Sequence, residues 1–218
     1  MLRVLEPELM EDGEQSLAYA RADFSSSNQW FVDQLLMDFP AAFHRVLDIG
    51  CGPCDVMLRL ARACPKTRIT AVDGSAAMIE LAAEAIRASG QGARIKAIEG
   101  YIPGLPLEEH SFDAVLSKDL LHHLPDPMVL WREARRLGRE GATLYVMDLI
   151  RPETEQDARD IVETVAPNEH EILKKDFYNS LCAAFTVEEV EDQARQANLR
   201  LEVAKISDRH MLIKGQLP

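Results

Sequence analysis

Short apolar, β-rich runs alternate with helical patterns from residue 44 onward. The first five of these runs are predicted strands, at 45–49, 68–72, 94–98, 114–117 and 143–148. The runs ITAV and LYVM are apolar throughout, which is typical of parallel strands that are covered on both faces. Strands that alternate with helices indicate right-handed βαβ units. We therefore expect an α/β fold built on a doubly wound parallel sheet.

Local signals mark the ends of the helices between these strands. Pro53 is expected at the first position of one helix, because its ring presets the backbone and no amide is lost there. Ser75 is expected to cap a second helix, which Gly90 ends. A third helix is predicted to open at Pro127 and to stop at Gly138.

The pattern changes after Pro152. Residues 153–183 are typical of two helices. Thr186 and Glu189 then match a capping box, in which Thr accepts from the N3 amide and Glu accepts from the cap amide. This signal predicts a further helix that runs to about Asn198.

Two alternating apolar and polar runs close the chain, at 200–206 and 210–214. Three turn-forming residues, Ser207, Asp208 and Arg209, separate them. We expect a terminal antiparallel hairpin, and no internal repeat.

Composition and charge narrow the classes of function. The 218 residues are 47% hydrophobic and 28% charged, which fits one globular domain. A net charge of −12 disfavours nucleic acid as a partner, because affinity for phosphate backbones comes mainly from clustered Lys and Arg. A small molecule is the expected substrate class.

The chain also lacks the sequence signals of export and membrane insertion. No apolar run approaches the length of about 18 residues that a membrane span needs. The N-terminus is acidic and has no basic end followed by an apolar stretch. We expect a cytoplasmic protein without membrane partners, in which the four cysteines are reduced thiols.

The segment Val46-Leu-Asp-Ile-Gly-Cys-Gly-Pro-Cys54 is a strand that ends in a glycine-rich turn before a helix. Glycines let the backbone pass close to a ligand, and a helix N-terminus offers free amides to a negative group. Asp73 ends the next strand, where a carboxylate accepts from the hydroxyls of a ribose in this topology. Together these features predict a site for an adenosine-type cofactor.

With these motifs the sequence resembles the class I S-adenosylmethionine-dependent methyltransferases, and especially the methyltransferase type 11 group. The resemblance runs from Val46 to Asp148 through VLDIGCGPC, ITAVDGSAAMIELA and EGYIPGLPLEEHSFDAVLSKDLLHHLPDP. It implies a Rossmann-like, seven-stranded sheet of order 3-2-1-4-5-7-6 with an antiparallel last strand, and S-adenosyl-L-methionine as cofactor.

The resemblance also implies roles for single residues around the cofactor. Asp48, Gly50 and Gly52 would surround its methionine part, and Asp73 would bind the ribose hydroxyls. The remaining contacts would be Gly74 and Met78 beside the adenine and Ser117 near the sulfonium.

Two positions depart from the family pattern. Cys54 stands where the loop usually has a third glycine, so the turn must be made with a Cβ present. Tyr101 stands where an acid often bonds the adenine amino group. We expect adenine recognition by backbone amides and by apolar contact with Tyr101 and Ile102, with Glu99 as a less favoured substitute.

Three other functions compete with methyl transfer. A nicotinamide dehydrogenase is disfavoured, because Asp55 stands where a dinucleotide fingerprint has glycine. Cys51-Gly-Pro-Cys54 matches a thioredoxin-type redox pair, and amide dipoles at a helix N-terminus would favour a thiolate there. A cofactor-binding regulatory protein without turnover is the third alternative.

The acceptor end of the site should lie at the carboxyl ends of the fourth and fifth predicted strands. Methyl transfer needs an in-line nucleophile and, where that nucleophile is protonated, a base. His122 is the candidate base, with Lys118 and Asp119 nearby and His123 expected to be structural. Asp148 is expected either to bond the substrate or to hold the loop at 149–152.

Two further segments are expected to complete the pocket. In similar methyltransferases an N-terminal helical segment folds over the cofactor, so residues 1–43 are a predicted lid ahead of a domain at 44–218. The lid candidates are Tyr19, Asp23, Phe24 and Trp30, of which Tyr19 would contact cofactor and Asp23 substrate. Tyr178 and Asn179 are substrate candidates in the helical insertion at about 151–185.

No metal site is assigned from the sequence, because His170 and its two flanking acids point apart on a helix.

Overall fold

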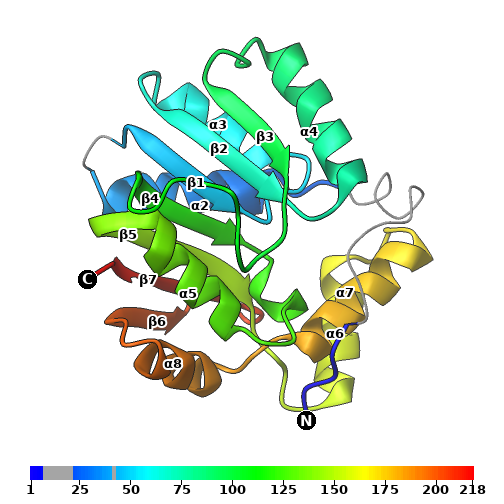
Figure 1. The fold of residues 1–218 in the computed structure, drawn as a ribbon. Helices are drawn as coiled ribbons and strands as arrows, with labels where there is room; N and C mark the ends of the chain where they lie inside the picture. Colours follow the sequence, from blue (N-terminus) through cyan, green and yellow to red (C-terminus); the bar gives the residue numbers. More distant parts are fainter. Residues whose placement is uncertain (7–21, 41–42) are drawn as a thin grey trace.

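A seven-stranded sheet forms the centre of the computed structural model, which describes residues 1–6, 22–40 and 43–218. The strand order is β3-β2-β1-β4-β5-β7-β6 (Figure 1). Their bounds are β1 Arg45–Ile49, β2 Arg68–Asp73, β3 Ile95–Glu99, β4 Phe112–Lys118, β5 Gly138–Leu149, β6 Leu201–Lys205 and β7 His210–Gln216. The first five strands are parallel, and β7 runs antiparallel to both β5 and β6. The predicted fold class, strand order and terminal hairpin are confirmed.

Helices cover both faces of the sheet (Figure 1). One face carries α2 Ser25–Asp38, α3 Asp55–Ala63 and α4 Ala76–Ser89, and the other carries α5 Met128–Leu137 and α8 Val187–Gln196. Two separate apolar clusters result, one on each face. Neighbouring strand residues divide between them, as Val46 belongs to the first and Leu47 to the second, both fully buried. Because both faces are covered, apolar residues follow one another along the inner strands.

A pair of helices stands apart at the carboxyl end of the sheet (Figure 1). These helices, α6 Glu155–Val165 and α7 Glu171–Ala183, enclose a small apolar cluster of their own. They lie in the predicted insertion and border the edge at which the parallel strands end.

The predicted helix caps are largely present. The Ser75 hydroxyl accepts from the Met78 amide at 3.3 Å, and Gly90 ends α4 in the left-handed region. Thr186 and Glu189 form the predicted capping box. A second box, of Thr154 and Asp157, caps α6 and was not predicted.

The predicted start of α3 is wrong, whereas the predicted stop at Gly138 is confirmed. Pro53 is not in a helix: the turn after β1 passes through Gly50, Gly52 and Cys54, all at positive φ, and α3 begins only at Asp55. Gly138 does end α5, but in extended conformation as the first residue of β5. A Cβ there would lie 2.2 Å from Leu217 Cδ1, so crowding requires this glycine.

Residues ahead of β1 contact the domain in two places. The α2 side chains Phe31, Val32 and Leu35 are buried in the first cluster, beside α3. The first six residues are extended and lie at α7, where the Val4 amide donates to the Cys182 carbonyl at 3.0 Å. The lid candidate Tyr19 lies outside the described residues. The division at residue 43 stays a prediction, and α2 itself is part of the core.

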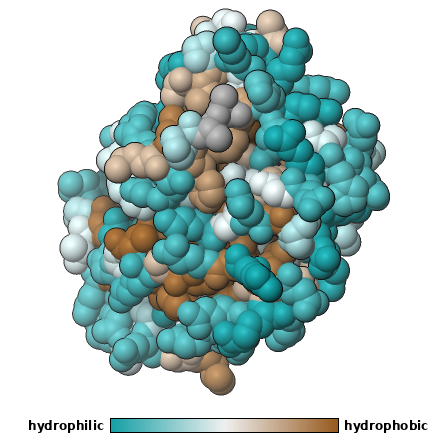
Figure 2. Space-filling model, turned by 90° about the vertical axis from the view of Figure 1, so that its left-hand side faces the viewer, coloured by the Kyte–Doolittle hydropathy of each residue, from teal (hydrophilic) through white to brown (hydrophobic). Residues whose placement is uncertain are grey.

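The described surface is mostly polar on the face that forms the left-hand side of Figure 1. Hydrophilic residues dominate that view, with narrower hydrophobic areas between them (Figure 2). None of the helices in the described part of the chain is long and apolar enough to cross a bilayer.

The first prediction concerns the left-handed residue Cys54, which has φ of 71° and is fully buried. A Cβ in this conformation costs roughly 1–2 kcal/mol. We therefore expect Cys54→Gly to be more stable than Cys54→Ala by about 1 kcal/mol, although glycine is normally the less stable of the two. Urea unfolding of both variants measures the difference. An alanine variant equal to or more stable than the glycine variant would contradict the strain.

Candidate active site

The turn between β1 and α3 lies at the carboxyl edge of the sheet. The Gly50 and Cys51 amides both donate to the Val72 carbonyl of β2, at 2.8 and 2.9 Å. A Cβ on Gly50 would lie only 2.8 Å from Leu120 Cβ, so this position has no room for a side chain. The turn is therefore held between β2 and the segment that follows β4.

Asp73 joins this turn to the next loop. Its Oδ2 accepts from the Gly52 amide at 2.8 Å, and its Oδ1 accepts from the Ser75 amide at 2.9 Å. Burial raises the pKa of Asp73, and the two amides lower it in part. An ionised carboxylate has about four acceptor sites, so this one retains capacity for two ligand hydroxyls.

Asp48, on β1, has surroundings that disfavour its ionised form. Its side chain is buried, and burial together with the charge of Asp73 raises the pKa of Asp48 to about 7, against an opposing effect of Lys118. A cation placed beside this carboxylate would favour its ionised form. The site is thus suited to the positive end of a ligand.

The surroundings of Cys51 oppose the thiolate that was expected in the Cys51–Cys54 pair. The Cys54 side chain, burial and the charge of Asp48 all raise the pKa of the Cys51 thiol. Both cysteines are free thiols and are buried. A thiol that is buried and close to a carboxylate is a poor nucleophile, so the surroundings of Cys51 do not favour dithiol catalysis.

The residues assigned to the adenine differ in exposure. Met78 is buried on α4, whereas Tyr101 is 53% exposed and Ile102 packs at the margin of the second cluster. Gly100 directly follows β3 and packs against Leu105. A Cβ on Gly100 would lie 2.7 Å from Leu105 Cδ2. Glu99 is exposed and pairs in register with Asp73. Gly74 lies between Asp73 and the cap Ser75.

The end of β4 combines hydrogen-bonded and charged side chains. Ser117 is buried and donates to the Ile49 carbonyl of β1 at 2.8 Å. Lys118 forms an ion pair with Asp119. Asp119 has φ of 57°, and its buried Oδ1 finds no hydrogen-bond donor in the described part of the chain.

His122 and Asp148 form a buried pair. The carboxylate Oδ1 lies 2.8 Å from His122 Nδ1, and Asp148 also accepts from the Leu121 and Leu149 amides. It therefore holds both the short helix η1 Leu121–His123 and its own strand end. Burial alone would lower the pKa of His122, but Asp148 and two further carboxylates together raise it above its ordinary value.

Sequence reasoning missed Glu6, which faces this pair. Glu6 Oε2 accepts from the Ser180 hydroxyl at 3.0 Å and lies 3.3 Å from His123 Nδ1. Burial and the neighbouring His122 lower the pKa of His123 to about 3, and the charge of Asp119 opposes them only in part. Glu6, His122 and His123 each offer a ligand atom, and these atoms all lie within 4.8 Å of one another. No local signal could reveal a contact between residues 116 or more positions apart.

Arg3 binds the N-terminal segment 1–6 to the backbone around η1 and to the end of α7. Its guanidinium donates to the His122 carbonyl at 2.8 Å, to the Leu124 carbonyl at 3.0 Å and to the Ala183 carbonyl. It also lies 3.8 Å from the centroid of the Phe185 ring. This residue, too, was not singled out from the sequence.

The substrate candidates are not brought together. Lys118 lies at β4, whereas Tyr178 packs between α6 and α7 with Arg159 5.7 Å from its ring centroid. Asn179 is half-buried on α7. Asp23 is exposed and accepts from the Ser25 amide at 2.9 Å, at the start of α2.

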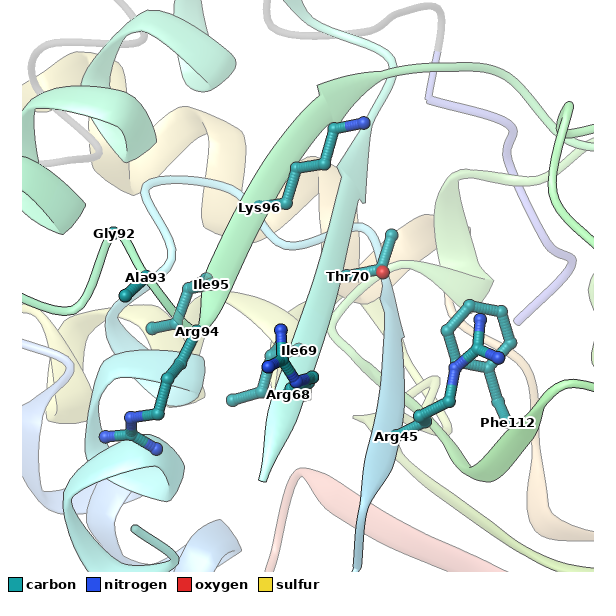
Figure 3. Close-up of a pocket in the computed structure, with 10 residues that line it drawn as sticks. All are labelled: Arg45, Arg68, Ile69, Thr70, Gly92, Ala93, Arg94, Ile95, Lys96 and Phe112. Atoms are coloured by element: carbon teal, nitrogen blue, oxygen red, sulfur yellow. The ribbon is translucent and has the colours of Figure 1, made fainter. Parts of the chain in front are cut away.

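A pocket of about 330 Å³ lies at the opposite end of the strands (Figure 3). It is lined by residues at the starts of β1, β2 and β3, among them Arg45, Arg68 and Arg94. The Arg94 guanidinium is bound to the Ala61 carbonyl at 2.6 Å, and Arg45 lies 5.3 Å from the Phe112 ring centroid. Because ligands of open α/β sheets bind at the carboxyl ends of strands, this pocket is distinct from the candidate site.

Known proteins match the chain in sequence and in fold. The family model described as "Methyltransferase domain" matches residues 47–146. The demethylmenaquinone methyltransferase of Porphyromonas gingivalis is 31% identical over 124 residues, which are 56% of this chain and 51% of that protein. The chain thus spans about half the length of this curated relative.

Solved structures extend the likeness of fold beyond the matched sequence. A SAM-dependent methyltransferase from Aquifex aeolicus superposes with a TM-score of 0.72 at 17% identity, covering 94% of this chain and 98% of that one. The [4+2]-cyclase SpnF superposes with a TM-score of 0.63 at 18% identity, covering 100% and 89%. At such identities the likeness concerns the fold alone. Residues 47–146 of this chain thus match a methyltransferase domain, and they lie in a sheet that has the predicted strand order.

Proposed function

We propose that this protein transfers the methyl group of S-adenosyl-L-methionine to a small-molecule acceptor. The observation that carries the proposal is the Asp73 carboxylate, which ends β2 and binds the Gly52 amide of the glycine-rich turn. In that arrangement a half-buried carboxylate would accept from the ribose hydroxyls beside the backbone of Gly52, which has no side chain.

In this proposal the cofactor lies across the ends of β1, β2 and β4. Asp48, Gly50 and Gly52 hold its methionine part, and Asp73 holds the ribose. The remaining proposed contacts are Gly74, Met78, Tyr101 and Ile102 at the adenine, Ser117 near the sulfonium, and Tyr19 from the N-terminal lid. When bound, the cofactor supplies an electrophilic methyl group.

The chain's own contribution at the acceptor end is orientation and proton handling. Asp148 fixes the position of His122 through a 2.8 Å hydrogen bond. We propose that His122 takes the proton of an acceptor that carries one, either directly or through a group bound at its free ring nitrogen. Lys118, Asp23, Tyr178 and Asn179 are the proposed substrate contacts.

A small acceptor of quinone type is the substrate class we favour. A relative of 31% identity is named as a demethylmenaquinone methyltransferase. The net charge of −12 opposes nucleic acid substrates. A cytoplasmic location without membrane partners is part of the same proposal.

A cofactor-binding protein that performs no methyl transfer is the alternative. SpnF, a [4+2]-cyclase, has the same fold, so the fold by itself does not determine the reaction. The alternative shares the cofactor site and differs only in turnover.

Calorimetry and a transfer assay test the proposal together. We expect S-adenosylmethionine and its demethylated product each to bind tighter than about millimolar. With radiolabelled cofactor, label should enter the small molecules of a metabolite extract that contains demethylated quinones, and should not enter total RNA. Weaker binding of both compounds would contradict both functions, and binding without transfer would favour the alternative. Labelled RNA would overturn the acceptor class.

Asp73→Asn tests the ribose contact. The amide retains one acceptor for the backbone but loses the charge-assisted hydrogen bonds to hydroxyls, which are worth roughly 1.5–3 kcal/mol each. We expect the dissociation constant for S-adenosylmethionine to rise at least tenfold. Asp33→Asn, an exposed substitution on α2, is the matched control and should bind normally. Unchanged affinity in a folded Asp73→Asn protein would remove this residue from the site.

The raised pKa of Asp48 predicts pH-dependent cofactor binding. A carboxylate with a pKa of about 7 is mostly protonated at pH 5.5 in the free protein. A cationic ligand binds the ionised form better, so affinity should rise about tenfold from pH 5.5 to 7.5 and then level off. Asp48→Asn should flatten this rise. Equal slopes in the wild-type protein and the variant would exclude Asp48 as the titrating group.

A further inference from the structure

Three potential metal ligands meet between the N-terminal segment and η1. Glu6 ends the extended segment 1–6, and His122 and His123 are neighbours in η1. Their ligand atoms lie within 4.8 Å of one another, and all three side chains are buried or half-buried. We propose that Glu6, His122 and His123 bind a divalent transition-metal ion, for which zinc is the best chemical match.

The distances suit a metal better than a hydrogen bond. Glu6 Oε2 and His123 Nδ1 are 3.3 Å apart. Charge-assisted hydrogen bonds are shorter, at about 2.7–2.9 Å. Two ligand atoms that are each about 2.0–2.1 Å from a tetrahedral zinc lie about 3.4 Å from one another. The observed separation is therefore close to that of two ligands on one zinc ion.

His122 makes the kind of second hydrogen bond that is common in metal-binding histidines. Asp148 holds His122 Nδ1 at 2.8 Å, so Nε2 is the ring nitrogen that would bind the metal. Metal-binding histidines commonly make this second hydrogen bond to a carboxylate, which fixes the tautomer and the ring orientation. The two imidazole rings lie side by side, with centroids 4.1 Å apart.

The carboxylate is supported in the same way. Ser180 of α7 donates to Glu6 Oε2 at 3.0 Å. Arg3 binds the His122 and Leu124 carbonyls, so both the segment that carries Glu6 and the backbone of η1 are fixed by contacts outside the ligand set. Both parts of the site are therefore held in place by the protein itself.

The donor set selects the class of metal. Two imidazoles and one carboxylate match zinc sites with three protein ligands and one open position, whereas magnesium and calcium prefer oxygen ligands. Asp148 and Asp119 add negative charge nearby, as their effect on the pKa of His122 indicates. The fourth position would take water or an oxygen of an acceptor.

The cluster has one competing explanation, namely that it only fastens residues 1–6 to α7. In that case Arg3, Glu6 and Ser180 would carry the contact and no metal would bind. The proposal does not depend on methyl transfer, because its readout is metal binding by the full chain.

Zinc chloride titrated into the chelator-treated protein tests the site by calorimetry. We expect one zinc per chain with a dissociation constant below about 1 μM. His123→Gln and Glu6→Gln should each weaken binding at least a hundredfold, and Asp148→Asn about tenfold or more. His170→Gln is the matched control, because His170 is an exposed histidine flanked by two acids at the start of α7, and it should bind zinc normally.

Cobalt substitution separates this site from the cysteines. A tetrahedral Co²⁺ with nitrogen and oxygen ligands should give visible bands without thiolate charge transfer in the near ultraviolet. Thiolate bands that disappear in Cys51→Ser, or zinc affinity unchanged in folded His123→Gln and Glu6→Gln, would overturn the proposal. Failure of wild-type protein to bind zinc tighter than about 10 μM would also overturn it. Cofactor titration of the same zinc-free protein reports on the proposed function independently.

Discussion

Burial of carboxylates at one edge of the sheet is the constraint on which this site depends. Asp48 is the second-last residue of β1, Asp73 ends β2, Asp119 follows β4, and Asp148 lies near the end of β5. Because a buried charge is costly unless it is paired or hydrogen-bonded, each carboxylate needs its own compensation. Asp73 and Asp148 receive backbone amides, Asp119 receives Lys118, and the raised pKa of Asp48 shows that it is compensated least.

This arrangement accounts for the kind of ligand the edge would accept. A cation near Asp48 would relieve a cost that the folded chain bears without it, and Asp119 Oδ1 has no donor in the described residues. A sulfonium cofactor and a divalent ion both carry positive charge. Carboxylates at this edge therefore favour both proposed ligands for one electrostatic reason, Asp48 at the cofactor site and Asp119 and Asp148 near the metal cluster.

The sequence predicted the parts that depend on local chemistry. Continuous apolar strands, Ser75 as a cap and the box of Thr186 and Glu189 each act within a few residues, and the structure has all of them. Pro53 was misjudged because the surrounding turn decides its conformation: three residues at positive φ displace the start of α3. Glu6 could not be found, since its partner Ser180 lies 174 positions away.

The short helix η1 links the two halves of the site. On one side Leu120, just before η1, packs against Gly50 so closely that no Cβ fits. On the other side Asp148 binds both the Leu121 amide and His122, and Arg3 binds the His122 carbonyl. A shift of η1 toward Glu6 would therefore move the side chain that limits the glycine turn. Cofactor and metal sites that share one rigid segment are energetically coupled whenever either ligand displaces that segment, and the coupling acts equally in both directions.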